Sequence, residues 1–292
     1  MKKRCRVLVL GVTGMLGSVV FRILAGTNGL DVFGSSRSSR GPQLPPEGHG
    51  KVICGIDIER SDDLVGAIQR IRPDVVINCV GVVKQLAAST DPLTVIPINS
   101  IFPHRLARLA SLVGARVIHI STDCVFSGLR GNYSEDDAPD AQDLYGRSKL
   151  LGEIDYDNAI TLRTSIIGHE LAGSRSLLSW FLSQTSEARG YTKAIFSGLP
   201  TDELARVIRD FVLPRPALRG LYHVSSAPID KYSLLRLVAE VYEKSINLVP
   251  DDTVKVDRSL SSERFRLSTG YVVPDWPTLV GNMRKHNEAG TV

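Results

Sequence analysis

Short apolar runs rich in β-branched residues alternate with longer amphipathic segments along the first part of the chain. The apolar runs predict strands over residues 5–10, 30–35, 52–56, 75–80, 116–121 and 159–163. The amphipathic segments predict helices near residues 15–25, 62–71, 103–113 and 145–157. Strands that are apolar throughout and separated by helices form βαβ units, whose parallel sheet is covered on both faces. The expected fold class is therefore α/β, with a Rossmann-type doubly wound parallel sheet.

The alternation breaks down after about residue 165. Helical patterns recur over residues 177–184, 202–212 and 232–244. The segment 259–277 is expected to be irregular, because aromatic residues and arginines are scattered among polar ones. We therefore expect a larger unit over residues 1–165 and a smaller C-terminal α/β lobe over residues 166–292, packed on the first and partly interleaved with it. The Gly-, Pro- and Ser-rich segment 38–50 predicts a mobile loop.

Composition narrows the class of protein. The 35 Lys and Arg residues against 31 Asp and Glu give a net charge of only +4, and no basic stripe points to nucleic acid. The four cysteines have no CxxC spacing and the six histidines have no metal-ligand spacing, so no metal site is expected. The apolar run after the basic N-terminus is too short for a signal peptide or a membrane span. These features predict a cytoplasmic protein without a membrane partner.

Three glycines follow the first predicted strand in the pattern G-x-x-G-x-x-G and lead into the first predicted helix. Gly11 permits the tight turn, Gly14 lets the backbone approach a pyrophosphate, and Gly17 lets helix and strand pack closely. The helix N-terminus then faces the phosphates with unpaired N–H groups. Residues 1–165 are thus predicted to be a dinucleotide-binding domain, and residues 166–292 mainly a substrate-binding lobe. The loop residues expected to bind the cofactor are Gly11, Thr13, Gly14, Met15, Leu16 and Gly17.

The residues after the second predicted strand indicate which dinucleotide is bound. An acidic residue there would bind the ribose 2′-hydroxyl of NAD, but this chain has Ser36 and Arg37, with Arg40 nearby. Because an arginine can hold a 2′-phosphate with two hydrogen bonds, we expect NADPH, with NADH possible. After the third strand, Asp57 either meets the adenine amine or caps the following helix. Further predicted cofactor contacts are Ile58, Cys79, Val80 and Gly81.

Thr122, Tyr145 and Lys149 form the predicted reacting group. Tyr145 and Lys149 are four residues apart and so share one face of a helix. A lysine ammonium beside a tyrosine favours the phenolate, so we expect Lys149 to lower the pKa of Tyr145 and make it a usable proton donor. Lys149 can also hold the nicotinamide ribose. Thr122, at the end of the fifth strand, can orient a substrate carbonyl.

These residues lie in segments that resemble the extended short-chain dehydrogenase/reductases, and among them the dTDP-4-dehydrorhamnose reductase-like branch. Residues 121–128 are Ser-Thr-Asp-Cys-Val-Phe-Ser-Gly, which resembles the motif Ser-Thr-Asp-Tyr-Val-Phe-Asp-Gly of that branch. An acidic, proline-bearing loop at 131–139 and the Tyr-Gly-Arg-Ser-Lys segment at 145–149 also match. Cys124 departs from the family tyrosine, and it also stands where related 4,6-dehydratases carry a glutamate. That departure favours simple reduction over dehydration.

The resemblance implies NAD(P)H-dependent reduction of the 4-keto group of a nucleoside-diphosphate-4-keto-6-deoxyhexose, in deoxysugar or surface polysaccharide biosynthesis. The residues expected to contact this nucleotide-sugar substrate are Thr122, Asp123, Val125, Tyr145, Arg258 and Arg264. Two alternatives stay open. One is an NAD-dependent sugar-nucleotide epimerase. The other is a non-catalytic dinucleotide-binding regulatory subunit, because the regulatory subunit of methionine adenosyltransferase looks like the same branch. A homodimer built on the helices that flank the active-site strands is possible.

Overall fold

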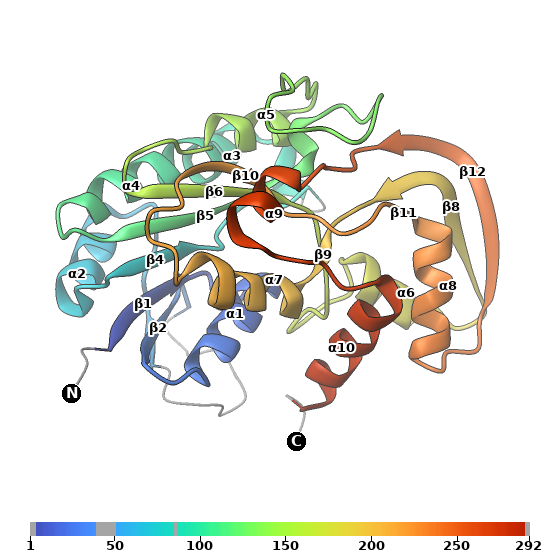
Figure 1. The fold of residues 1–292 in the computed structure, drawn as a ribbon, viewed down its shortest axis with the longest axis horizontal. Helices are drawn as coiled ribbons and strands as arrows, with labels where there is room; N and C mark the ends of the chain where they lie inside the picture. The colour runs from blue at the N-terminus through green and yellow to red at the C-terminus, as the bar shows by residue number, and fades with distance from the viewer. Residues whose placement is uncertain (1–3, 39–50, 85–86, 290–292) are drawn as a thin grey trace.

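The computed structural model describes residues 4–38, 51–84 and 87–289 (Figure 1). The strands are β1 (Cys5–Leu10), β2 (Leu30–Ser36), β3 (Lys51–Cys54), β4 (Val75–Asn78), β5 (Arg116–Thr122), β6 (Ala159–Thr164), β7 (Ile166–Ile167), β8 (Glu187–Phe196), β9 (Leu199–Pro200), β10 (Gly220–His223), β11 (Ile229–Asp230) and β12 (Asn247–Asp257). The α-helices are α1 (Met15–Ala25), α2 (Ser61–Ile71), α3 (Pro92–Val95), α4 (Phe102–Ser111), α5 (Leu144–Leu151), α6 (Leu177–Ser183), α7 (Thr201–Val207), α8 (Lys231–Val241), α9 (Glu263–Thr269) and α10 (Trp276–Ala289). Short π-helical segments follow α3, over Ile96–Ile101, and α7, over Ile208–Val212.

A seven-stranded sheet in the order β10-β6-β5-β4-β1-β2-β3 forms the centre of the molecule. Every neighbouring pair in it is parallel. The strand order reverses between β1 and β4, and the crevice at such a reversal is where open α/β sheets bind their ligands. The predicted doubly wound α/β class is confirmed, and the six predicted strands correspond to β1–β6 within one to two residues.

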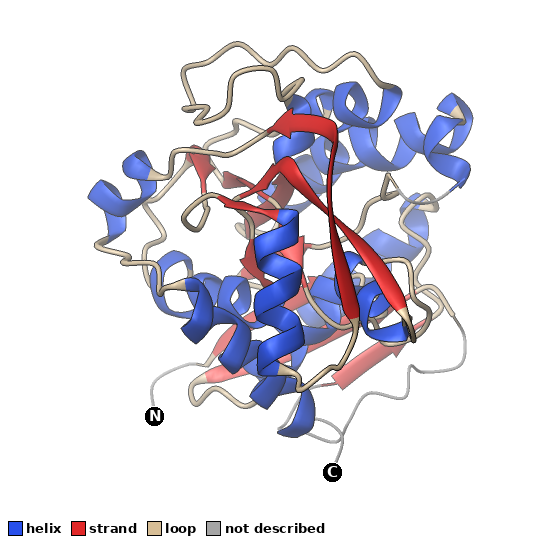
Figure 2. Ribbon diagram, turned by 90° about the vertical axis from the view of Figure 1, so that its right-hand side faces the viewer, coloured by secondary structure: helices blue, strands red, loops and turns tan. Residues whose placement is uncertain are grey.

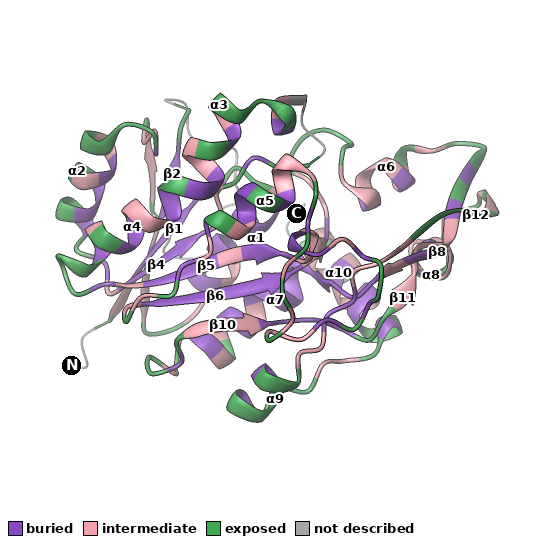
Figure 3. Cartoon of the chain, turned by 90° about the horizontal axis from the view of Figure 1, so that it is seen from above, coloured by how far each residue is buried: buried purple, intermediate pink, exposed green. Residues whose placement is uncertain are grey.

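Alternating side chains of the parallel strands supply both faces of the sheet. Val7 and Val9 of β1 point into one apolar cluster with α1 and α7, whereas Leu8 and Leu10 point into a second cluster with α2 and α4. All four side chains are fully buried, and the inner strands are buried along their length (Figure 3). Burial on both faces explains why these strands are apolar throughout instead of alternating with polar residues.

A smaller, three-stranded sheet in the order β11-β8-β12 lies at the opposite end of the molecule from α2 (Figure 1). Helix α8 packs on β8, and Figure 2 views the molecule from this end. Residues beyond 165 also return to the large sheet, because β10 pairs in parallel with β6. That pairing agrees with an interleaved arrangement, although the boundary at residue 165 stays a prediction.

Two sequence expectations about helices are wrong. The helix expected over 145–157 ends at Leu151, with Gly152 as its C-cap. At Gly152 the chain packs closely on the π-helical segment, because a Cβ there would stand 1.8 Å from the carbonyl oxygen of Asn99. The segment 259–277, expected to be irregular, contains α9 and the start of α10. Gly270, with φ +76°, ends α9 in the left-handed conformation that glycine adopts without strain.

The described part of the chain contains no helix that is both long and apolar enough to cross a membrane. The predicted mobile loop over 38–50 falls almost wholly outside the described residues, as does Arg40.

Candidate active site

The glycine-rich turn lies at the carboxyl end of β1, beside the end of β4. Gly11 has φ +84°, and a Cβ there would stand 3.0 Å from the Val80 side chain and 3.4 Å from the backbone of Cys79. A Cβ on Gly17 would stand 2.2 Å from the carbonyl oxygen of Gly11. The first and third glycines therefore serve the turn and the helix–strand contact that the sequence predicts for them.

The N-terminus of α1 directly follows the glycine-rich turn. Gly14 precedes α1 in an extended conformation, and no side chain of the described residues caps it. Thr13 and Gly14 are exposed at the tip of the turn, whereas the Leu16 side chain packs in the core, which leaves its backbone amide for a ligand. Unpaired amides at a helix N-terminus suit a pyrophosphate.

The end of β2 holds a buried hydroxyl that lacks a partner. Ser36 is 2% exposed, and its Oγ forms no hydrogen bond with the described part of the chain. Arg37 follows it and is exposed, while Asp31 lies at the other end of the strand and pairs with Arg4 at 3.2 Å. A buried hydroxyl without a partner is costly, so this edge fits a ligand with oxygen atoms. The observation agrees with the predicted dinucleotide at this position.

The structure at the end of β3 tests one of the two roles that the sequence left open for Asp57, the capping of the next helix. Its Oδ1 accepts a hydrogen bond from the amide of Glu59 at 3.0 Å, in the turn before α2, and the N-cap residue of α2 is Arg60. The helix-capping role for Asp57 is therefore wrong, and the adenine contact stays a prediction. The Ile58 side chain packs in the core, so only its backbone faces outward.

The end of β4 is held by buried amide side chains. Oδ1 of Asn78 accepts from the amide of Val80 at 3.1 Å. Oδ1 of Asn99, in the π-helical segment, accepts from the amide of Val82 at 2.9 Å, and its Nδ2 donates to the Val82 carbonyl at 3.1 Å. A Cβ on Gly81 would stand 3.4 Å from Asn99 Oδ1. These bonds fix the backbone of residues 79–82 beside the glycine-rich turn.

Thr122 and Tyr145 meet at the carboxyl end of β5. The Thr122 Oγ1 accepts from the amide of Cys124 at 3.1 Å, and the same side chain is hydrogen-bonded to Tyr145. Helix α5 begins at this point because Asp143 caps it, with Oδ1 accepting from the amide of Gly146 at 2.7 Å. The predicted pairing of a threonine and a tyrosine is thus present in the structure.

Lys149 lies beneath them, one turn further along α5. Its ammonium donates to the carbonyl of Ile120 at 2.8 Å and lies next to Cys79 and Gly81 at the end of β4. Burial lowers the pKa of Lys149 to about 8, while the nearby Glu153 carboxylate acts in the opposite direction. Lys149 therefore links the end of β5, which carries Thr122, to the end of β4.

The pKa of Tyr145 differs from the sequence expectation. Burial raises it, and neighbouring Cys124 adds to that effect, while the hydrogen bond with Thr122 lowers it. Lys149 is not one of the main groups that shift the pKa of Tyr145. In the protein alone, burial thus outweighs the lysine, and the phenol keeps its proton at neutral pH.

Asp123 and Cys124 complete the floor of the site. Burial raises the pKa of the Asp123 carboxyl, against the lowering effects of Arg258 and Lys231, and raises that of the Cys124 thiol to about 12. A thiol with such a high pKa is a poor acid–base group, in agreement with the expectation that Cys124 does not replace a glutamate.

The remaining predicted substrate residues differ in where the structure places them. Arg258 lies near Asp123 and donates from Nε to the Phe126 carbonyl at 2.8 Å. Arg264 is instead paired with the acidic loop, 2.6 Å from Asp136. The Val125 side chain is fully buried in a small apolar cluster, which leaves only its backbone for a substrate. A substrate contact by either residue stays a prediction.

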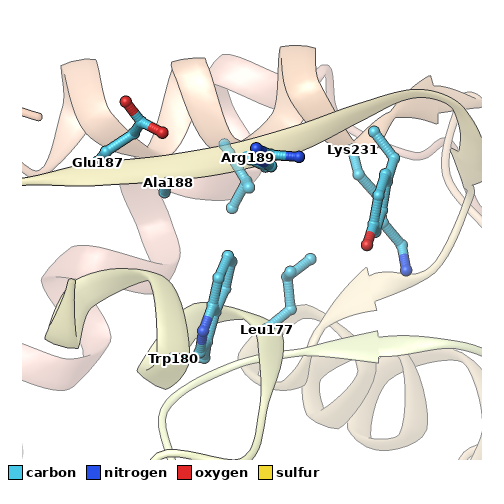
Figure 4. A pocket seen from close by; sticks show the side chains of 8 residues that line it. Leu177, Trp180, Glu187, Ala188, Arg189 and Lys231 are labelled. Carbon is cyan, nitrogen blue, oxygen red and sulfur yellow. The ribbon is translucent and has the colours of Figure 1, made fainter. Parts of the chain in front are cut away.

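A cavity of about 560 Å³ opens between α6, β8 and the start of α8 (Figure 4). Trp180 and Leu177 rise from α6 toward Arg189 on β8, with Lys231 at the end of the cavity. The electrostatic influence of Lys231 on Asp123 links the cavity to the reacting hydroxyls. Sequence reasoning missed this cavity, because its residues come from three separate elements and form no local motif.

Titratable groups elsewhere do not suggest a metal centre. The described residues contain no group of three or more His, Cys, Asp or Glu side chains placed to hold a metal ion.

Comparison with known proteins adds to this geometry. The protein-family model described as RmlD substrate binding domain matches residues 5–261. A dTDP-4-dehydrorhamnose reductase of Escherichia coli strain K12 is 29% identical over 314 residues, with 98% of each chain covered. Methionine adenosyltransferase 2 subunit beta of Danio rerio is 29% identical over 261 residues, covering 84% of this chain and 76% of that protein. In three dimensions, the crystal structure of a dTDP-4-dehydrorhamnose reductase from Bacillus anthracis in complex with NADP superposes with a TM-score of 0.77 at 21% identity, covering 97% of this chain and 99% of the other.

Proposed function

Because the chain belongs to the family of the RmlD substrate binding domain, we propose that it is a reductase that uses NADPH to reduce the 4-keto group of a nucleoside-diphosphate-4-keto-6-deoxyhexose. The observation that carries this proposal is the meeting of Thr122, Tyr145 and Lys149 beside an open helix N-terminus at the reversal point of the sheet. The reaction belongs to the synthesis of a deoxysugar, and the product would supply a surface polysaccharide or a glycosylated metabolite.

The chain's own residues have distinct tasks in this reaction. The hydroxyl of Thr122 orients the substrate carbonyl, and the phenol of Tyr145 gives its proton to the oxygen as negative charge develops there. At neutral pH the phenol of Tyr145 carries the proton that this step transfers, because burial raises its pKa above the ordinary value. Lys149 binds the ribose of the nicotinamide with its ammonium. The bound nicotinamide supplies the hydride to carbon.

The proposed preference for NADPH rests on the end of β2. The Ser36 hydroxyl has no partner in the described part of the chain, and Arg37 is an exposed cation where NAD-binding chains need an acid. We expect Arg37→Ala to weaken NADPH binding by about 10-fold or more, since it removes a charge-assisted hydrogen bond, and to leave NADH binding nearly unchanged. Fluorescence titration of both cofactors checks this. Equal losses for both cofactors would contradict a contact with the 2′-phosphate.

We place the nucleotide end of the substrate in the cavity at α6 and β8. The aromatic face of Trp180 and the guanidinium of Arg189 suit a planar base. Lys231 suits the diphosphate: it lies half-buried at the end of the cavity, and no described residue forms a hydrogen bond or ion pair with its ammonium. Arg258 also acts electrostatically on Asp123.

Replacing Lys231 with methionine should raise the KM for the nucleotide sugar by about 10- to 100-fold, the usual effect of losing a hydrogen bond to a charged group. The KM for NADPH should stay unchanged. The matched control is Lys193→Met on the same lobe, because Lys193 pairs with Asp252 at 2.9 Å and does not line the cavity. Steady-state kinetics with each substrate varied in turn would make the comparison. A KM that rises equally in both variants would count against the placement.

The function itself is tested by NADPH oxidation with freshly prepared dTDP- and UDP-linked 4-keto-6-deoxyhexoses. Turnover establishes the reductase and begins to name the nucleotide. Tight NADPH binding without turnover on any of these sugars would favour the second candidate, a non-catalytic dinucleotide-binding subunit, to which the Danio rerio relative lends support. Tightly held NAD in the purified protein would favour the epimerase.

We also propose a homodimer. Three exposed apolar side chains lie on adjoining elements: Leu93 on α3, Ile101 at the end of the π-helical segment and Leu151 at the end of α5. A second copy of the chain would cover them. Sedimentation equilibrium should give twice 31.9 kDa, and a single-chain mass at micromolar concentration would exclude the dimer.

A further inference from the structure

Glu153 lies just past the C-terminal end of α5 and makes three short contacts with the large sheet. Its Oε1 accepts from the Ser121 hydroxyl at 2.7 Å on β5 and from Arg163 Nε at 2.7 Å on β6. Its Oε2 accepts from Arg163 Nη2 at 2.7 Å. Ser121 and Arg163 are direct neighbours in the β5–β6 pairing, so one carboxylate grips the ends of both strands.

Helix α5, which precedes Glu153, also binds Ile120, the residue before Ser121. The ammonium of Lys149 donates to the carbonyl of Ile120 at 2.8 Å. Lys149 and Glu153 are thus bound to consecutive residues of β5, with the hydroxyl of Thr122 following directly after them. Any displacement of the Glu153 carboxylate from Ser121 therefore changes where the helix places Lys149 relative to the reacting hydroxyl.

We propose that Glu153 is a positioning residue for Lys149, which fixes the end of α5 on β5 and β6 and provides the counter-charge that holds the ammonium in place. The proposal rests on the proposed function, because it assigns Lys149 to the cofactor ribose. Glu153 itself touches neither cofactor nor substrate.

A purely structural role explains the arrangement less well. The Arg163 side chain is 3% exposed and that of Glu153 11% exposed. A buried ion pair of this kind is often no more stabilising than apolar side chains of similar volume, because both charges lose their hydration. A second feature also points beyond stability: besides pairing with the guanidinium of Arg163, the carboxylate raises the pKa of the Lys149 ammonium electrostatically.

The charges around Lys149 give the sign of the expected effect. The titratable groups that interact electrostatically with it are Glu153 past the end of α5, the Cys79 thiol just after β4 and the His119 imidazole on β5. Burial lowers the pKa of Lys149 to about 8, and the negative charge of Glu153 raises it against that effect. Removing the Glu153 charge therefore lowers the pKa further, so the ammonium is lost at a lower pH.

The test is the pH dependence of NADPH binding to the whole protein, followed by fluorescence. In the wild type, affinity should fall as pH rises and Lys149 loses its proton. In Glu153→Gln the fall should begin about one pH unit lower, because a neutral amide no longer supports the ammonium. Glu153→Asp keeps the charge, so the pH at which NADPH affinity begins to fall should move back toward the wild-type value. The matched control is Glu288→Gln, which removes a carboxylate 2.8 Å from Arg284 on the surface of α10 and should change nothing.

Ser121→Ala keeps the inference testable if Glu153→Gln does not fold. This variant retains the buried ion pair but removes the hydroxyl that holds the carboxylate on β5, so the fall should move in the same direction by a smaller amount. Folded variants that lose thermal stability yet bind NADPH with the wild-type pH dependence would overturn the proposal and leave Glu153 a structural residue. Since cofactor binding does not require turnover, absence of reductase activity would count against the proposed function alone.

Discussion

Tyr145→Phe should reduce turnover of the nucleotide sugar by about 10²- to 10⁴-fold, the usual contribution of a positioned proton donor. The substitution removes one hydroxyl from a half-buried side chain and leaves its ring unchanged, so the ring should keep its place. Because Lys149 and the glycine-rich turn are untouched, the dissociation constant for NADPH should change little. Single-turnover measurement of NADPH oxidation, beside a cofactor titration, separates the two effects.

Tyr133→Phe is the matched control for this prediction. It also removes a phenol hydroxyl, but Tyr133 stacks on Phe126 and its hydroxyl only accepts from the amide of Arg130 at 3.2 Å. We expect a small loss of stability and normal turnover. A Tyr145→Phe protein that keeps most of its rate would remove the proton-transfer role and point to a non-catalytic dinucleotide-binding protein.

Gly17→Ala should have the second largest effect, on cofactor binding and stability together. The added methyl group would stand 2.2 Å from the carbonyl oxygen of Gly11, which is backbone and cannot rotate away. The glycine-rich turn, which we propose binds the pyrophosphate, must therefore shift. We expect a loss of about 1–3 kcal/mol in the free energy of unfolding and at least about a 10-fold weaker affinity for NADPH. Denaturant unfolding and fluorescence titration measure the two quantities.

Gly66→Ala is the control for that substitution. Gly66 lies in α2, and a Cβ there meets no atom within 4 Å. Alanine is the better helix former, so stability should rise by about 0.5–1 kcal/mol with no change in NADPH affinity. Equal behaviour of the two variants would mean that close packing at Gly17 does not shape the cofactor turn.

Local sequence patterns were sufficient for six of the seven strands of the central sheet and for the glycine-rich turn, but they missed β10. Strands buried on both faces must be apolar throughout, so β1 and β4 stand out in the sequence, and the glycines of the turn have a fixed spacing. Strand β8 escaped prediction because it buries small residues under α8. At Gly190 a Cβ would stand 2.7 Å from the backbone of Tyr232, so the strand has no apolar run to recognise.

The candidate site was predictable only where its residues belong to motifs. Thr122, Tyr145 and Lys149 lie in two short segments, and the structure brings those segments together. Lys231 and Arg264 show the limit of such reasoning. Whether a cation is available to a ligand depends on which distant carboxylates reach it: Asp136 holds Arg264, whereas nothing in the described chain pairs with Lys231. The pKa of Tyr145 likewise depends on burial, which spacing does not reveal.

The return of β10 to the large sheet has a consequence for how the protein is made. On the ribosome, β6 emerges well before β10, and the intervening residues include β8 and α7. The edge of β6 therefore stays without its neighbour until most of the later lobe has been synthesised. We infer that the sheet cannot close during synthesis of the N-terminal part alone, so the cofactor half and the lobe that holds the cavity complete their folding together. A chain cut short before residue 220 would expose the unpaired edge of β6 to aggregation.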